Sequence, residues 1–274
     1  MDDQQQQEDG GHLLGNFKNY YAFHPVEQRL NLFPQNFFVN LHESLGYPKQ
    51  LFLLDVGCNE GDLSIAIYFH AKKELNTAAR ECQVKMLGTD IDAVLINRAY
   101  EKSREIEFDV HFIAMDYMDQ DSTGELHLFL RQHGVTSFDF VSLFSITMWI
   151  HVNFGWDGLS EFLRRSLDLT RACLLVEPQP RKCYRSARTR CRRQKLNPPP
   201  FLEKSFSEDT SRSESTDEIV RQILLSNIQV EPGAIGSILK EKVDSIATIQ
   251  CVNWGTEDWG RSLLLFEKAR YKMI

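Results

Sequence analysis

The sequence predicts an α/β protein, with an open and mostly parallel sheet, helices on both faces and an antiparallel hairpin near the C-terminus. Two observations indicate this fold class. Short apolar strand patterns alternate with helical patterns through five units between residues 51 and 176. Two further strand patterns near the end are joined by a connection too short for a crossover helix, which favours antiparallel pairing.

The N-terminal region precedes the first strand pattern. Residues 1–15 are polar and acidic and lack the apolar core of a secretory signal, so we expect a disordered tail. Residues 26–45 place apolar side chains at roughly helical spacing, and Pro34 is expected to split them into two short helices. Residues 16–50 would then form an arm in front of the sheet.

The first predicted strand, residues 51–56, is a continuous apolar run, as in a strand that is buried on both faces. A glycine turn follows, and a helix is predicted from Asp62, which we expect to be its N-cap. The same reasoning predicts the remaining strands at residues 85–89, 110–114, 138–143, 173–176, 245–252 and 262–266. It predicts the remaining helices at residues 93–104, 123–133 and 158–170.

A polar stretch separates the fifth strand pattern from the hairpin. Residues 194–242 are predicted to be a flexible insertion, because Pro198 and the prolines after it stop a helix and residues 205–218 are rich in Ser, Thr, Asp and Glu. With 274 residues, 42% of them hydrophobic, the chain is expected to form one domain over residues 16–274.

Charge is distributed unevenly along the chain. The net charge is −7, yet residues 181–195 hold eight basic residues and no acidic one. A compact basic block attracts polyanions such as RNA. A solvated helix face is the alternative, because the arginines of this block recur at helical spacing. No apolar run is long enough for a membrane span, and the six cysteines lack zinc-site spacing, so neither a membrane nor a metal is expected.

Acidic residues are predicted at the ends of successive strands. The motif D-x-G-x-N-x-G begins at Asp55, Asp90 ends the second strand, and Asp116 follows the third. In open α/β sheets, ligands bind at the carboxyl ends of the strands. There, Asp90 could accept both hydroxyl groups of a cofactor ribose. The alternative is that these acids are helix caps and loop residues.

The D-x-G-x-N-x-G motif resembles motif I of the S-adenosylmethionine-dependent methyltransferases, which implies their Rossmann-like class I fold and S-adenosyl-L-methionine as cofactor. Residues 15–30, 144–153, 175–180 and 258–266 resemble the bicoid-interacting-protein-three family. That family contains a methylphosphate capping enzyme of a small nuclear RNA and a shorter RNA 5′-monophosphate methyltransferase, which is associated with histidine tRNA and pre-microRNA. This chain is more similar to the shorter enzyme, although it has Arg181 where the family has Trp.

The resemblance implies a set of site residues. The expected cofactor contacts are Tyr21, Arg29, Gly57, Cys58, Asn59, Asp90, Ile91, Asp116, Tyr117 and Phe144. Within that set, Arg29 would pair with the methionine carboxylate. His151 is the candidate catalytic residue at the phosphate, with a buried, hydrogen-bonded histidine as the alternative. The expected RNA contacts are His24, Lys182, Tyr184, Arg185, Arg188 and Arg192.

The resemblance also implies a function, namely methylation of the 5′-monophosphate of small RNAs by a cytoplasmic enzyme, with a nuclear location not excluded. A monophosphate oxygen is already anionic near neutral pH, so catalysis would depend mainly on proximity and orientation. Three alternatives remain open: an enzyme that caps the γ-phosphate of RNA, a methyltransferase acting on a small molecule or protein, and an RNA-binding protein without activity.

Overall fold

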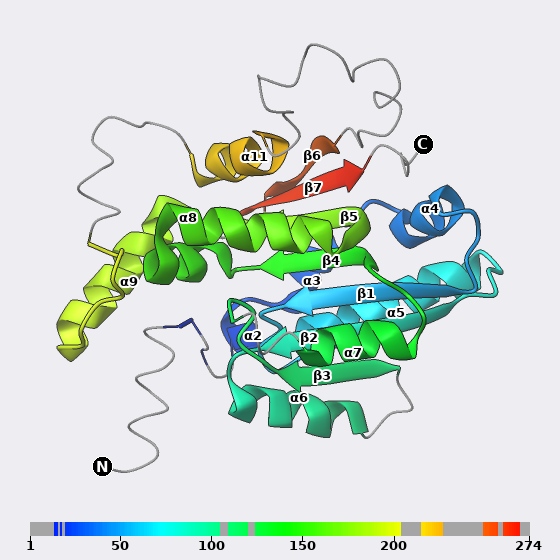
Figure 1. Cartoon of the computed structure of the whole chain (residues 1–274), viewed down its shortest axis with the longest axis horizontal. Coiled ribbons are helices and arrows are strands. Elements are labelled where there is room, and N and C mark those ends of the chain that lie inside the picture. The colour runs from blue at the N-terminus through cyan, green and yellow to red at the C-terminus, as the bar shows by residue number, and fades with distance from the viewer. Residues whose placement is uncertain are drawn as a thin grey trace.

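The computed structural model describes residues 14–15, 17, 20–104, 109–119, 124–203, 215–226, 249–256 and 260–268. Within these residues, seven strands form one sheet in the order β3-β2-β1-β4-β5-β7-β6 (Figure 1). Their bounds are β1 Gln50–Val56, β2 Gln83–Asp90, β3 Val110–Ala114, β4 Phe138–Phe144, β5 Thr170–Glu177, β6 Ile249–Thr256 and β7 Ser262–Lys268. The pairings among β1 to β5 are parallel, whereas β7 pairs antiparallel with both β5 and β6. The predicted parallel sheet and its C-terminal hairpin are therefore confirmed.

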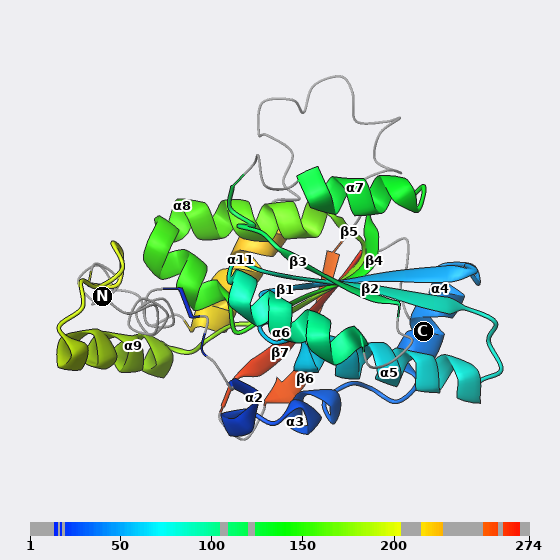
Figure 2. The same cartoon turned by 90° about the horizontal axis from the view of Figure 1, so that it is seen from below.

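Helices cover both faces of this sheet. The described helices are α2 Tyr20–Phe23, α3 Val26–Leu30, α4 Phe37–Ser44, α5 Asp62–Thr77, α6 Ala93–Arg104, α7 Gly124–Gln132, α8 Thr147–Asp168, α9 Arg181–Gln194 and α11 Thr216–Ser226. Helices α7 and α8 lie on one face, and α4, α5 and α6 lie on the other (Figure 2). None of the helices described is both long and apolar enough to cross a membrane.

Strand β1 shows how the core is divided. Phe52 and Leu54 pack in the cluster that includes α7, α8 and α11, whereas Leu51 and Leu53 pack in the cluster that includes α4 and α5. Successive side chains of a strand point to opposite faces, so a strand covered on both faces needs apolar residues at every position. This requirement explains the continuous apolar run that predicted β1.

Several element boundaries differ from those predicted, and two of the differences have a clear structural cause. Helix α8 begins at Thr147, eleven residues before the predicted start, because the helix bends at Gly155 (φ 71°, ψ −169°) and only its second half was recognised. At α5, Asp62 is the first helical residue rather than the N-cap. Gly61 occupies the cap position with φ 80°, and the Asp62 carboxylate accepts a hydrogen bond from Lys102 Nζ at 2.7 Å.

The predicted flexible insertion contains a helix that sequence reasoning missed. Helix α11 packs against α8 and buries Val220 and Leu224 in the core. The polar composition on either side of residues 216–226 hid this short amphipathic pattern. Residues 204–214 and 227–242 of the insertion lie outside the described part of the chain, as do residues 245–248 of the strand predicted at 245–252 and residues 1–13 of the predicted tail.

Candidate active site

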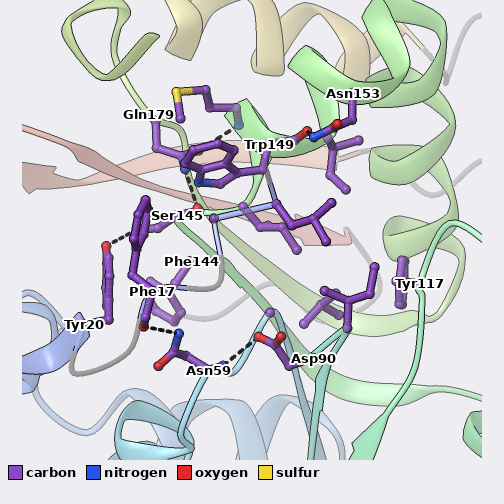
Figure 3. Close-up of a pocket in the computed structure, with 18 of the residues that line it drawn as sticks. Phe17, Tyr20, Asn59, Asp90, Tyr117, Phe144, Ser145, Trp149, Asn153 and Gln179 are labelled. Atoms are coloured by element: carbon purple, nitrogen blue, oxygen red, sulfur yellow. Dashed lines mark hydrogen bonds between the residues drawn. The ribbon is translucent and has the colours of Figure 1, made fainter. Parts of the chain in front are cut away.

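A cavity of about 550 Å³ lies at the carboxyl ends of the parallel strands. Its wall includes residues of the N-terminal arm, the turn after β1, the ends of β2 and β4, and helices α8 and α9. Figure 3 shows Asn59 and Asp90 on one side of it and Trp149, Gln179 and Asn153 on the other. Nine residues predicted from the sequence line this cavity, namely Tyr21, His24, Gly57, Asn59, Asp90, Ile91, Asp116, Tyr117 and Phe144.

The turn after β1 is fixed to the end of β2. The backbone N–H groups of Gly57 and Cys58 donate to the Thr89 carbonyl oxygen at 2.7 and 2.9 Å, and the Asn59 N–H donates to Asp90 Oδ2 at 2.9 Å. Gly57 has φ 78°, and a Cβ atom at this position would lie 2.9 Å from Cδ1 of Ile146. The turn therefore needs glycine both for its backbone conformation and for its close packing.

We expect Gly57→Ala to lower the free energy of unfolding by about 2–5 kcal/mol. A left-handed alanine costs about 1–2 kcal/mol, and forcing a methyl group against Ile146 adds about 1–3 kcal/mol. Gly46→Ala is the matched control, because Gly46 has φ 79° and a Cβ atom added there would meet nothing within 4 Å. Urea denaturation of both variants separates the cost of the left-handed backbone from the cost of the contact with Ile146. An equal loss of unfolding free energy in both variants would contradict the close packing at Gly57.

Two carboxylates mark one end of the cavity. Asp90 is 8% exposed and accepts hydrogen bonds from the Asp92 and Asn59 N–H groups, yet burial outweighs these contacts and raises the pKa of its carboxyl group. Asp116 Oδ1 accepts the Met118 N–H at 2.8 Å. Both acids thus organise loop backbone and also line the cavity. In the described part of the chain, no group of three or more His, Cys, Asp and Glu side chains is placed to hold a metal ion.

The acidic end fits the adenosyl part of S-adenosylmethionine. Ile91, Met115 and Tyr117 provide apolar surface beside Asp90, and Ile91 is 42% exposed. A planar base needs apolar walls, and a ribose needs an acceptor for its hydroxyl groups. Gly57 lines the cavity at the same end.

A buried group of charged and polar residues adjoins the other end of the cavity. We name it the Glu177 cluster, and it consists of Tyr20, Arg29, Ser145, Glu177 and Arg261. Arg29 Nε donates to Glu177 Oε2 at 2.6 Å, and Arg261 Nη1 donates to Glu177 Oε1 at 2.8 Å. The hydroxyl groups of Tyr20 and Ser145 lie 2.8 Å apart. Glu177 is fully buried and does not line the cavity, so its charge is balanced inside the protein.

Arg29 and Cys58, two of the expected cofactor contacts, lie behind the cavity wall. Arg29 is 0% exposed, and its guanidinium makes two hydrogen bonds to Glu177, so its placement does not support a contact with the methionine carboxylate. Burial disfavours its charge, but the attraction of Glu177 prevails and raises the pKa of Arg29. The Cys58 side chain is also 0% exposed, and burial raises the pKa of its thiol.

His151 and Tyr184 also lie behind the wall. His151 Nδ1 is 3.1 Å from the Tyr184 hydroxyl, and the two residues are 3% and 7% exposed. The imidazole ring also packs on Trp156, with ring centroids 3.7 Å apart. This placement agrees with the alternative of a buried, hydrogen-bonded histidine, which here joins α8 to α9.

The basic block forms the amphipathic helix α9, whose buried residues are Tyr184, Ala187 and Cys191. Lys182 and Arg185 are exposed. Arg188 and Arg192 form ion pairs with Glu203, with N–O distances of 2.8 and 3.4 Å. None of these four predicted RNA contacts lines the cavity. Arg188 and Arg192 therefore lie as the alternative of a solvated helix face predicts, on the outer side of α9 and paired with an acidic residue of the protein itself.

Several cavity residues were missed by sequence reasoning. They include Phe17, Tyr20, Phe23, Ser145, Met148, Trp149, Asn153, Phe154, Gln179, Cys183, Arg190 and Arg261. Trp149 and Arg261 lie in two of the segments that resemble the family, so this resemblance could have identified them as site residues. Arg190 belongs to the basic block, where its guanidinium carbon lies 5.1 Å from the centre of the Phe17 ring, and burial lowers the pKa of this arginine.

Comparisons with known proteins give consistent matches. A family model described as Bicoid-interacting protein 3 (Bin3) matches residues 138–268. The chain is 41% identical to an RNA 5′-monophosphate methyltransferase of Pongo abelii, covering 94% of this chain and 82% of that protein. It is 37% identical to a pre-miRNA 5′-monophosphate methyltransferase of Xenopus laevis, covering 96% and 94%. The solved structure of a TehB-like SAM-dependent methyltransferase from Corynebacterium glutamicum is 12% identical, with a TM-score of 0.40 and coverage of 92% and 100%.

Proposed function

The chain belongs to the Bicoid-interacting protein 3 family, and on that premise we propose that it methylates the 5′-monophosphate of small RNAs with S-adenosylmethionine as methyl donor. One observation carries the proposal: the same cavity is lined by Asp90 and Asp116, at the end of β2 and just after β3, and by Arg190 and Arg261, from α9 and the residue before β7. The name of the Xenopus relative supports pre-microRNA as a substrate. Histidine tRNA as a substrate and a cytoplasmic location are proposed from the family resemblance.

The acidic end is the proposed cofactor site. Asp90 would accept the ribose hydroxyl groups, Ile91 and Tyr117 would pack on the adenine, and the turn at Gly57 and Asn59 would pass close to the ligand. Asp116, Tyr21 and Phe144 complete the proposed set, and all of these residues line the cavity. When bound, S-adenosylmethionine supplies a methyl group on a positively charged sulfur, which an anionic oxygen can accept without a general base.

The basic end is the proposed acceptor site. Arg190 and Arg261 line it together with His24. Burial, reinforced by Arg261 and Arg29, lowers the pKa of His24 to about 4, so this histidine is neutral at pH 7 and the arginines supply the positive charge. A terminal phosphate carries a charge of about −1.5 to −2 at this pH, which suits that end. Lys182 and Arg185, exposed on α9, would contact the RNA backbone.

The chain's own contribution to the reaction would be binding and orientation. The phosphate needs no proton removed, so the protein must hold its oxygen in place and keep water away. The apolar wall serves this purpose, because Trp149 and Phe17 pack edge to face with ring centroids 5.9 Å apart. Such positioning can contribute about 7–11 kcal/mol to lowering a barrier.

The test compares transcripts that differ only at the 5′ end. With radiolabelled S-adenosylmethionine, we expect RNA with a 5′-monophosphate to be methylated at least about a hundredfold faster than RNA with a 5′-hydroxyl, which would need a general base. We also expect little activity on 5′-triphosphate RNA. Its two additional phosphates would have to enter a cavity of about 550 Å³ whose far end carries Asp90 and Asp116.

Each alternative function predicts a different result in this assay. Equal turnover of triphosphate and monophosphate ends would favour a γ-phosphate capping enzyme. Labelling of protein or metabolites in place of RNA would favour another acceptor, and RNA binding without any labelling would favour a non-catalytic protein. RNA treated with phosphatase before the assay is the control, and its labelling would contradict a phosphate acceptor.

We expect His151→Gln to retain methyl transfer within a few-fold, because His151 does not line the cavity and bonds to Tyr184 at its back. A catalytic acid or base would instead be worth about 10²–10⁴-fold in rate. His151→Phe leaves the Tyr184 hydroxyl without this partner and should lower the free energy of unfolding by about 1–3 kcal/mol. Values of kcat/KM on 5′-monophosphate RNA provide the measurement. A hundredfold loss in the glutamine variant at unchanged stability would restore the catalytic role.

A further inference from the structure

Arg261 reaches the cavity from the connection between β6 and β7. It immediately precedes β7, and β7 runs antiparallel to β5, so the start of β7 lies beside the end of β5, where Glu177 is found. In the strand order, β5 and β7 lie on the opposite side of β1 from β2, which carries Asp90. The topology therefore places Arg261 at the end of the cavity away from the proposed adenosine site.

The hydrogen bonds of Arg261 leave part of its guanidinium for a ligand. Nη1 donates to Glu177 Oε1 and the Tyr20 hydroxyl, both at 2.8 Å, and to Ser145 Oγ. Within the described ranges, Nη2 contacts only the Cys183 sulfur, at 3.9 Å, and sulfur is a weak acceptor. Nε is buried and has no hydrogen-bond partner among the described residues. Buried donors are nearly always paired in folded proteins, so these groups point to a missing acceptor.

The charges around Arg261 favour an anion as that acceptor. Glu177 is shared between Arg261 and Arg29, and one carboxylate can balance only one of two guanidinium charges. Among the described residues that line the cavity, the carboxylates are Asp90 and Asp116, at the far end. Burial disfavours the charge of Arg261, which is 9% exposed, but attraction to Glu177 outweighs it and raises the pKa of the guanidinium. Arg261 thus remains a cation in a water-poor site.

We propose that Arg261 binds the 5′-phosphate of the RNA and that Glu177 and Arg29 position it for this contact. The inference rests on the proposed function and names the residue that distinguishes a phosphate from a hydroxyl end. Glu177 holds one edge of the guanidinium, so the planar group is oriented before the ligand arrives. An oriented guanidinium can form paired hydrogen bonds to phosphate oxygens, which a lysine cannot reproduce.

The test measures how well the protein distinguishes two RNA ends. Short RNAs with a 5′-phosphate or a 5′-hydroxyl are titrated against the full chain in the presence of S-adenosylhomocysteine, and the ratio of the two dissociation constants is compared. We expect Arg261→Gln to reduce this ratio by about ten- to a hundredfold and Arg261→Lys to reduce it less. Affinity for S-adenosylmethionine should remain within a few-fold of the native value in both variants.

Arg171→Gln is the matched control. Arg171 lies at the opposite end of β5, where its Nη1 donates to Asp139 Oδ1 at 3.1 Å, and it does not line the cavity. The variant removes an arginine that is also paired with a carboxylate on the same sheet. The ratio of the two RNA dissociation constants should therefore stay at the native value. An equal fall in the ratio for Arg171→Gln and Arg261→Gln would overturn the assignment to Arg261.

The remaining outcomes separate this inference from the function on which it rests. If the native protein methylates 5′-monophosphate RNA but Arg261→Gln leaves the binding ratio unchanged, Arg261 does not bind the phosphate. A loss of S-adenosylmethionine affinity with an unchanged ratio would assign Arg261 to the methionine carboxylate and also overturn the inference. Absence of methylation by the native protein would overturn the proposed function, and the binding ratio would still decide the role of Arg261. If Arg261→Gln fails to fold, Arg261→Lys decides, and an unchanged ratio in that variant overturns the inference.

Discussion

Replacing Asp90 with alanine is expected to weaken S-adenosylmethionine binding by about ten- to a hundredfold while the domain stays folded. Asp90 lies at the end of β2 and lines the acidic end of the cavity. Its carboxylate would form charge-assisted hydrogen bonds with the two ribose hydroxyl groups, and losing both together is expected to cost about 1.5–3 kcal/mol of binding free energy. Isothermal titration calorimetry with S-adenosylmethionine measures the loss.

Two further variants isolate this contact. The Asn59 and Asp92 N–H groups bond to different oxygens of Asp90, so Asp90→Asn keeps an acceptor for one of them and tests the loss of charge with less disturbance of the turn than alanine causes. Asp109→Ala is the matched control, because Asp109 accepts a hydrogen bond from Lys85 Nζ at 2.6 Å and does not line the cavity. Native affinity in Asp90→Ala would remove Asp90 from the proposed site, and so would an equal loss in Asp109→Ala.

Replacing Glu177 with alanine is expected to lower the free energy of unfolding by about 3–5 kcal/mol. Glu177 is the common acceptor for Arg29 and Arg261, at distances of 2.6 and 2.8 Å. Its removal leaves two guanidinium groups that are 0% and 9% exposed without their carboxylate partner. Breaking a buried ion pair from one side costs more than the pair itself contributes, because the remaining charge stays buried.

An exposed pair provides the comparison for Glu177. Glu161 Oε1 accepts a hydrogen bond from Arg164 Nη2 at 2.6 Å on the surface of α8, where both side chains are about half exposed. We expect Glu161→Ala to change the free energy of unfolding by less than about 1 kcal/mol, since water stabilises both charges. Urea denaturation of the two variants tests the contrast, and similar small losses would show that the Glu177 cluster does not depend on its charge pairing.

Local sequence patterns were sufficient to predict the sheet and the acidic end of the cavity. The run at residues 51–56 and the patterns at residues 93–104 and 110–114 are local signals, and each corresponds to a described element. Alternation of strands and helices then implies parallel pairing, which brings the carboxyl ends of the strands together. Asp90 and Gly57 could be placed in the site because a residue at a strand end is located by the strand itself.

The side chains that face the cavity at its basic end could not be predicted from local patterns, because long-range packing orients them. Arg29 and Arg261 lie 148 and 84 residues from Glu177 in the chain, so no local pattern shows that they share one carboxylate. The packing of α9 on α8 likewise turns His151 toward Tyr184 and away from the cavity. An arginine or a histidine can serve either as a ligand contact or as a paired internal group. Its role depends on partners that long-range packing supplies, because a buried polar group is stable only where distant segments provide its hydrogen bonds.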